Sequence, residues 1–156
     1  MSESRTLART DCLDLLAAGS VGRVAVTTPD GPHIVPVSYT VFDDSVVVRT
    51  SAYSLLGTYA RDAVVAFEVD AFDPGSRSGW SVVVRSRCTV EGDPSTIREI
   101  RTAAPDAPWA GGTRNLYLRL RLDQVTGRTV GDLTPAAVAR RSLESLGSGS
   151  DAYTGT

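Results

Sequence analysis

Two runs rich in β-branched residues, separated by a short turn sequence, constrain the fold of this chain more than any other feature. The runs cover residues 21–28 and 33–42, and Pro29-Asp30-Gly31-Pro32 lies between them. An Asp-Gly pair supplies the positive φ that a hairpin turn requires, and β-branched residues fit a pleated strand. A second turn pair, Asp43-Asp44, leads into residues 45–51. We therefore expect three successive antiparallel strands connected as a meander.

The clearest single strand lies nearer the carboxyl end. Leucine occupies every second position from 116 to 122, with tyrosine or arginine at each position between. This period of two directs one row of side chains into a core and the other row to the opposite face. Apolar runs at 64–69 and 80–90 predict two further strands. About six strands are expected in all.

Short helices are expected between these strands. Thr10 has the side chain of an N-cap, and apolar residues follow it at helical spacing before Gly19, so a first helix is predicted there. Similar patterns predict helices at 54–60 and at about 95–102, and Thr134-Pro135 has the chemistry of a last helix start. The apolar residues of the first helix are Cys12, Leu15 and Leu16.

The order of these elements lacks β-α-β alternation, so we expect a mainly β fold: a closed or partly split antiparallel β-barrel with a few short helices. The 156 residues suit one domain, which should span 1–146. Residues 147–156 are small and polar, and they are expected to form a flexible tail.

Charge and cysteine content exclude several classes of function. The net charge is −2, which argues against a nucleic-acid partner, and no apolar run is long enough for a membrane span. The two cysteines, Cys12 and Cys88, have no metal-ligand spacing, and we expect both to be buried in a reducing compartment. These features predict a cytoplasmic protein. Every basic side chain is arginine, so arginine must make any cationic ligand contact.

Hydrolytic and metal-binding motifs are missing from the sequence. Its one histidine, His33, lies at the start of a predicted strand, and no nucleophile elbow, zinc motif or phosphate loop occurs. Glu68 is the one acid inside a strongly apolar strand. It either faces solvent or points into a cleft, where Arg49 or Arg85 would pair with it.

Five segments stand out jointly through their order and spacing. They are Val21-Gly22-Arg23-Val24-Ala25, Val35-Pro36-Val37-Ser38-Tyr39, Val47-Val48-Arg49-Thr50-Ser51, Val65-Ala66-Phe67-Glu68-Val69-Asp70 and Gly79-Trp80-Ser81-Val82-Val83-Val84-Arg85. Together with 108–112 and 125–128, they resemble the pyridoxamine 5′-phosphate oxidase-related family of FMN-binding split barrels, especially its small actinobacterial-type members. The resemblance covers about residues 11–129.

The resemblance implies a homodimer that holds FMN in a groove between its subunits. By position, the phosphate contacts would come from Arg49, Thr50 and Ser54, and Ser51 would be a further cofactor-binding residue. Ser38 and the backbone around Tyr39 would approach the polar edge of the flavin ring. Trp80 and Ser81 would close the site from the partner chain.

One feature departs from the family pattern. Members commonly carry a lysine on the phosphate just after the strand that binds it, whereas this chain has Tyr53-Ser54-Leu55 there. The asparagine often found at the Ser38 position is also missing. A charge-assisted contact is worth roughly 1.5 to 3 kcal/mol, so its loss would weaken FMN binding by about one to two decades unless Arg49 or Arg61 compensates.

The leading hypothesis is therefore an FMN-dependent oxidoreductase acting on an unidentified small molecule. Vitamin B6 oxidation is not implied, because the substrate-phosphate arginines of the true oxidases have no counterpart near the carboxyl end. Two alternatives remain open. One is a reductase that uses the deazaflavin F420 in the same groove, and the other is a non-enzymatic dimeric module for haem or another flat ligand, or with an empty groove.

Overall fold

The computed structural model describes residues 4–104, 112–133 and 137. Its helices are α1 (Arg9–Ala18), α2 (Leu55–Tyr59) and α3 (Pro94–Ala103), and its strands are β1 (Arg5–Thr6), β2 (Val21–Thr28), β3 (Gly31–Phe42), β4 (Ser45–Thr50), β5 (Val64–Asp73), β6 (Ser78–Glu91), β7 (Leu116–Arg121) and β8 (Gln124–Val130). The strands β1 and β8 were not expected as such, and β5 and β6 are longer than predicted. The predicted last helix and the tail lie outside the described residues.

The strands form one antiparallel sheet in the order β1-β8-β6-β5-β2-β3-β4-β7, and β6 also pairs with β7. The extra pairing closes the strands from β6 to β7 into a six-stranded barrel, while β8 and β1 continue the sheet beyond β6. The long strand β6 makes this possible, because its first half pairs with β8 and its last residues pair with β7. The expected mainly β, split antiparallel barrel is confirmed.

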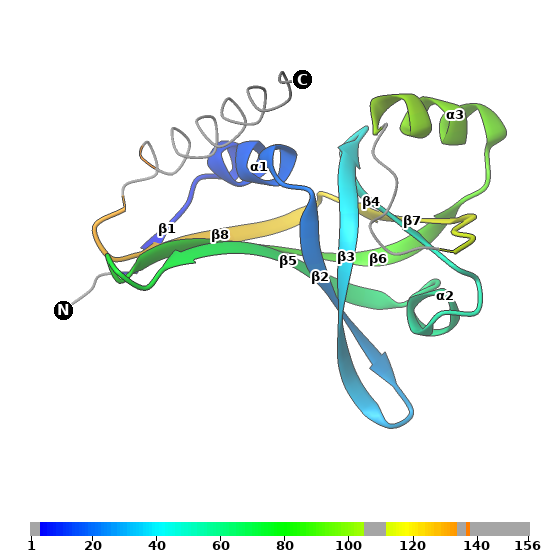
Figure 1. Cartoon of the computed structure of the whole chain (residues 1–156), viewed down its shortest axis with the longest axis horizontal. Coiled ribbons are helices and arrows are strands. Elements are labelled where there is room, and N and C mark those ends of the chain that lie inside the picture. The colour runs from blue at the N-terminus through cyan, green and yellow to red at the C-terminus, as the bar shows by residue number, and fades with distance from the viewer. Residues whose placement is uncertain (1–3, 105–111, 134–136, 138–156) are drawn as a thin grey trace, which may run out of the picture.

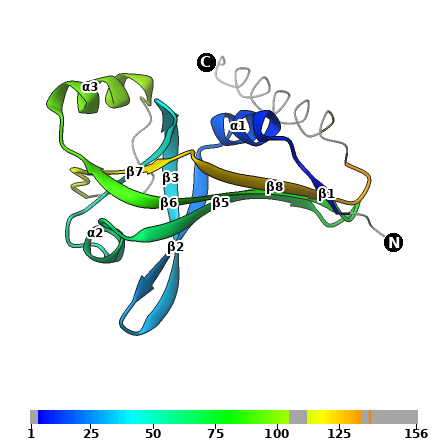
Figure 2. The ribbon, with the colours of Figure 1, turned by 180° about the vertical axis from the view of Figure 1, so that it is seen from behind.

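Both predicted tight turns are present with two residues each, but the first is centred one residue earlier than the predicted Asp30-Gly31 pair. The pairing of Thr28 with Gly31 leaves Pro29 and Asp30 as the first turn, and Gly31 has a φ of 111°. Asp43 and Asp44 form the second turn with φ values of 45° and 51°, the left-handed pair that a tight hairpin favours. The β2–β3 hairpin projects well beyond the rest of the barrel in Figures 1 and 2.

The helix α1 packs on the main core beside β8 (Figure 1). Its residues Cys12, Leu15 and Leu16 are buried, as predicted. The prediction that Thr10 caps the helix is wrong, because α1 already begins at Arg9 and its N-cap is Ala8, which offers no side-chain hydrogen bond. Burial of the apolar face therefore stabilises this helix more than capping does.

Tyr39 ties β3 to α1 inside the main core. Its hydroxyl donates a hydrogen bond of 2.6 Å to the carbonyl oxygen of Leu16, and its ring meets the Phe67 ring edge-on at 4.8 Å. Burial raises the pKa of the Tyr39 hydroxyl. Gly22 lies against the same aromatic pair, since a Cβ there would come within 2.5 Å of the Phe67 ring. This part of the core is closely packed.

The helix α3 covers the outer face of β4 and β7. Asp93 caps it by accepting the backbone N–H of Thr96 at 2.8 Å, and a smaller apolar cluster of Val47, Ile100 and Tyr117 lies beneath it. The leucine row of β7 faces the main core as expected, but Tyr117 on the other row is buried as well. The alternation of β7 could not reveal this, because α3 supplies the second apolar layer.

An ion pair fixes the end of β6 that leads into α3. Arg119 donates a hydrogen bond of 2.8 Å to Glu91, and its side chain is 18% exposed while that of Glu91 is 13% exposed. The backbone N–H of Asp93 also donates to Glu91, at 2.9 Å. This backbone contact, and then the arginine, lower the pKa of the Glu91 carboxyl.

Candidate functional site

The register of β3 and β4 separates the predicted site residues into two groups. Tyr39 pairs with Val48, and both side chains are buried in the main core. Because successive side chains of a strand point to opposite faces, Ser38 and Arg49 lie on the outer face, while Thr50 is directed inward. Thr50 is only 4% exposed. From the sequence we expected these residues to form one cofactor site, but the sheet places them on opposite faces.

A small pocket lies where the outer face of β3 and β4 meets the end of α3. Its volume is about 40 Å³, which is room for a small polar group and not for a flavin ring. The lining residues are Ser38, Thr40, Val47, Arg49, Ile100, Arg101 and Ala104. Two of the predicted cofactor ligands, Ser38 and Arg49, are thus brought together, and Arg101 joins them from a helix to which the sequence assigned no role.

Tyr117 orders the two arginines of this pocket. The Cζ atoms of Arg49 and Arg101 lie 5.3 Å and 5.8 Å from the centroid of its ring. The Nε of Arg101 donates a hydrogen bond of 2.8 Å to the Tyr117 hydroxyl. The Nε of Arg49 is buried and has no hydrogen-bond partner. Within the described part of the chain, neither guanidinium forms an ion pair with a carboxylate.

This arrangement is chemically suited to an anion. Two guanidinium groups share one neutral ring, two hydroxyl side chains line the same pocket, and a buried N–H lacks an acceptor. Unpaired buried donors cost free energy, and an oxyanion would supply the missing acceptor. Planar guanidinium groups bind phosphate and carboxylate oxygens through two parallel hydrogen bonds.

The hydroxyls of Thr50 and Ser54 are engaged elsewhere. Ser54 is the N-cap of α2: its Oγ accepts the N–H of Gly57 at 3.0 Å and donates to the carbonyl oxygen of Ser51 at 2.8 Å. The Oγ1 of Thr50 lies 2.7 Å from the same Ser54 oxygen. A hydroxyl has one proton, so Thr50 must be the donor in this contact. A phosphate bound by either hydroxyl would have to displace one of these bonds, whereas the Ser51 hydroxyl keeps its proton available.

Trp80 and Ser81 lie in the first half of β6, where they pair with Thr129 and Arg128 of β8, whereas β6 meets β7, the neighbour of β4, only through residues 88–91. Trp80 is half-buried and packs against the main core, while Ser81 points to the outer face opposite Asp70. One protomer therefore does not place either residue beside Arg49. Their role as residues of the partner chain stays a prediction.

Glu68 lies on the outer face of β5. It accepts a hydrogen bond of 2.9 Å from Arg23, its cross-strand neighbour on β2, and Asp70 lies 3.4 Å from the same nitrogen. The sequence left open whether Glu68 faces outward or points into a cleft. The structure shows the outward orientation, and Glu68 pairs with Arg23, not with Arg49 or Arg85. Partial burial, and then Asp70, raise the pKa of the Glu68 carboxyl.

Large apolar side chains are exposed on this outer face as well. We call them the outer apolar face: Val21, Ile34, Val64 and Phe72, which are 44%, 71%, 53% and 57% exposed. The burial patterns of β2, β3 and β5 place them on the side of the sheet away from the main core. Val64 and Phe72 lie at opposite ends of β5, with the Arg23–Glu68 ion pair between them, so these apolar side chains are spread along the face.

Other sequence predictions concern the thiols, the histidine and the class of site. Cys12 and Cys88 are free and buried as expected, and burial raises the pKa of Cys88 to about 12. His33 is exposed. Among residues 4–104 and 112–133, no group of acids, histidines or cysteines is arranged to hold a metal ion. No helix in the described ranges is long and apolar enough to cross a membrane.

The six-stranded antiparallel barrel with two added strands places this protein in the split-barrel class. The chain belongs to the pyridoxamine 5′-phosphate oxidase family, whose sequence model matches residues 8–129. That match agrees with the resemblance seen in the sequence.

Three individual proteins illustrate what this chain is similar to. An uncharacterized protein from Mycobacterium tuberculosis is 33% identical over 132 residues, which cover 81% of this chain and 86% of the relative. The solved structure of an FAD-binding protein from Mycobacterium smegmatis superposes with a TM-score of 0.68 at 29% identity, covering 81% of this chain and 98% of that one. A pyridoxamine 5′-phosphate oxidase-type structure from Corynebacterium glutamicum gives a TM-score of 0.66 at 26% identity, covering 82% and 94%.

Proposed function

We propose that this protein is a flavin-dependent oxidoreductase that binds FMN with the phosphate at Arg49. The buried Nε of Arg49, which lacks a hydrogen-bond partner in a pocket that Ser38 also lines, carries the proposal. A phosphate oxygen would satisfy this donor and add a charge-assisted contact. The pocket has room for a small group such as a phosphate, so the flavin ring would lie outside it on the outer face.

A bound flavin would supply the hydride or electron transfer, and the protein would supply binding, orientation and a dry surface. In this proposal Arg49 binds the phosphate, and the Ser38 hydroxyl, which lines the same small pocket, adds a second phosphate contact in place of the ring-edge contact expected from the sequence. The Ser51 hydroxyl, which keeps its proton free, adds a neutral donor near the end of β4. The substrate is a small molecule.

We also propose that the protein acts as a homodimer. The outer apolar face leaves four large side chains exposed, and the β2–β3 hairpin that carries Ile34 projects from the barrel (Figure 2). A second copy would bury this surface and bring its Trp80 and Ser81 to the open side of the groove. The two unpaired, buried cysteines support a cytoplasmic protein.

FAD is the second candidate ligand. The M. smegmatis structure at 29% identity is described as an FAD-binding protein, and FAD carries a diphosphate that two arginines could also bind. F420 also carries phosphate, and it remains the alternative on the same fold. Haem is named for another M. smegmatis neighbour, which is only 19% identical and supports the shared fold alone.

The test is a titration of the purified full-length protein with FMN, FAD and F420, followed by ligand fluorescence, in the wild type and two variants. R49A should weaken FMN binding by about 10- to 100-fold, the loss of one charge-assisted contact. R121A is the matched control, because Arg121 is 71% exposed and pairs with Asp123 away from the pocket. Equal FMN affinity of R49A and wild type would refute the phosphate assignment.

Two further measurements separate the remaining alternatives. Size-exclusion chromatography with light scattering should give twice the chain mass, and a monomer at micromolar concentration would exclude the shared groove. A Soret band after haem addition, with no saturable flavin or F420 binding, would favour the non-enzymatic module. If FMN binds, transfer of electrons from NADH or NADPH through the bound flavin to an acceptor tests the oxidoreductase assignment.

A further inference from the structure

We propose that Arg101 provides a second cation for the ligand's phosphate, and that Tyr117 positions it. The inference rests on the proposed function, because it names a residue of the same site. It places the anion between two guanidinium groups, one from β4 and one from the last turn of α3, in a two-arginine clamp formed by Arg49 and Arg101.

The turn between β4 and α2 offers no cation for an anion bound at Arg49. Residues 51–60 contain neither lysine nor arginine. Arg61 follows α2, is exposed and does not line the pocket. Arg101 is therefore the second cation that the described residues bring to this pocket.

Tyr117 holds Arg101 in a defined orientation. The Tyr117 ring is 1% exposed and packs with Val47 and Ile100, so it forms a rigid base. Its hydroxyl accepts the Nε hydrogen of Arg101 at 2.8 Å, which fixes the plane of that guanidinium and leaves the two terminal nitrogens for a ligand. The same ring lies beneath Arg49.

Within the described residues, no carboxylate pairs with the two positive charges of the clamp. Two like charges over one ring repel each other; Arg49 is half-buried, and Arg101 is exposed to solvent. Among the described residues, Arg23, Arg119 and Arg121 pair with carboxylates away from the clamp, and no ion pair involves Arg49 or Arg101. A dianionic phosphate monoester would remove the repulsion and satisfy the buried Nε of Arg49.

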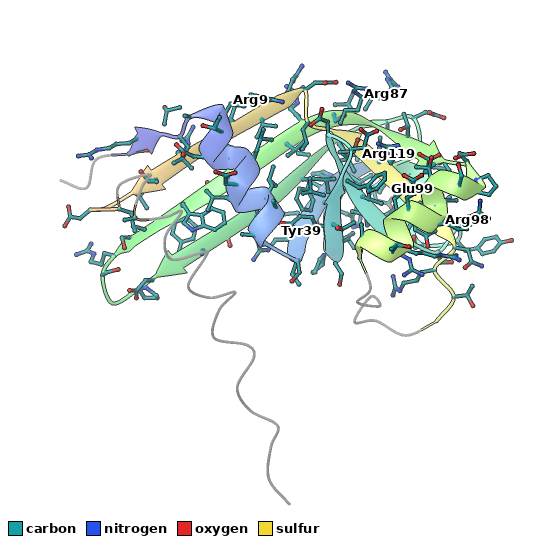
Figure 3. All side chains as sticks on the ribbon, turned by 90° about the horizontal axis from the view of Figure 1, so that it is seen from above. Arg9, Tyr39, Arg87, Arg98, Glu99 and Arg119 are labelled. Atoms are coloured by element: carbon teal, nitrogen blue, oxygen red, sulfur yellow. The ribbon has the colours of Figure 1, made fainter. Side chains whose placement is uncertain are left out.

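The experiment compares FMN with riboflavin, which has the same ring and no phosphate. The variants are R101A, R101K and Y117F, and the control is R98A, since Arg98 projects from the same helix, is exposed and lies outside the clamp (Figure 3). We expect R101A to weaken FMN binding by about 10- to 100-fold and to leave riboflavin binding within about twofold. The FMN affinity of R101K should lie between those of R101A and wild type, because lysine keeps the charge but loses the planar geometry.

Tyr117 is a positioning residue, and the salt dependence of binding tests its role. Y117F keeps the ring and removes the acceptor for Arg101, so we expect a smaller loss of FMN affinity than in R101A. The FMN affinity of the wild type should fall with added salt more steeply than that of R101A, which has one cation fewer. Urea unfolding of each variant confirms that the fold is retained.

Two results would overturn the proposal: FMN affinity of R101A equal to that of wild type, or equal losses for FMN and riboflavin. If the wild type binds no flavin, the proposed function fails and the clamp is tested with inorganic phosphate. Phosphate should then raise the thermal midpoint of wild type and R98A but not of R101A. No rise in the wild type would overturn the clamp as well.

Discussion

Replacement of Ser54 by alanine tests the assignment of its hydroxyl to the α2 cap. Loss of an N-cap costs about 1 kcal/mol, and the Oγ1 of Thr50, which is buried, would lose its acceptor at a cost of about 1 kcal/mol more. We therefore expect S54A to lower the free energy of unfolding by about 2 kcal/mol. With a urea m-value of about 2 kcal/mol per molar, the midpoint should fall by about 1 M.

The assay is urea unfolding at fixed protein concentration, followed by circular dichroism, with FMN affinity measured in parallel. S51A is the control for the urea midpoint alone, since the Ser51 hydroxyl makes one long contact with the N–H of Tyr53 at 3.3 Å and has a proposed role in FMN binding. The T50V/S54A double variant should cost less than the sum of the two single variants, because no hydroxyl is then left unpaired. An unchanged urea midpoint together with weakened FMN binding in S54A would refute the capping argument and restore Ser54 as a phosphate ligand.

Three further predictions test the rest of the structure. G22A should destabilise the protein by about 2 kcal/mol, because its Cβ would overlap an aromatic ring, whereas G92A, with open space around its Cβ, should change the urea midpoint little. E91Q should lower the free energy of unfolding by about 1 to 2 kcal/mol at pH 7. Because the pKa of Glu91 is lowered in the folded protein, the difference in stability between wild type and E91Q should shrink as the pH falls through the acid range. A difference that does not change with pH would contradict this. Cys12 and Cys88 should react with a thiol reagent only slowly until urea unfolds the protein, since both are buried with raised pKa values.

Local features made most of the barrel predictable. The tight turns, the alternation in β7 and the apolar spacing of α1 act over a few residues, and the sequence displays them directly. The errors lie where tertiary packing overrides a local rule. Thr10 has good capping chemistry, yet the N-cap of α1 is Ala8, two residues earlier, because its buried face decides where the helix lies.

The candidate site was only partly predictable. Sequence order placed Arg49, Thr50 and Ser54 together, but it could not show that Thr50 faces inward or that Ser54 caps a helix. Neither could it find Arg101, because the contact with Tyr117 joins a helix to a strand that follows it after a connecting segment. An arginine in the last turn of a helix is usually a solvent-exposed residue that suits the helix dipole, so its sequence context gave no signal.

By itself, the sequence determined the class of fold, the family and the strand that carries Arg49. Those properties follow from periodicity, turn chemistry and the order of short segments, which can all be read directly from the sequence. The tertiary structure alone decided which side chains share the outer pocket and which are committed to the core. The physical reason is that the face of each strand depends on its register with partners far away in sequence, and the clamp exists only because α3 docks across β4 and β7.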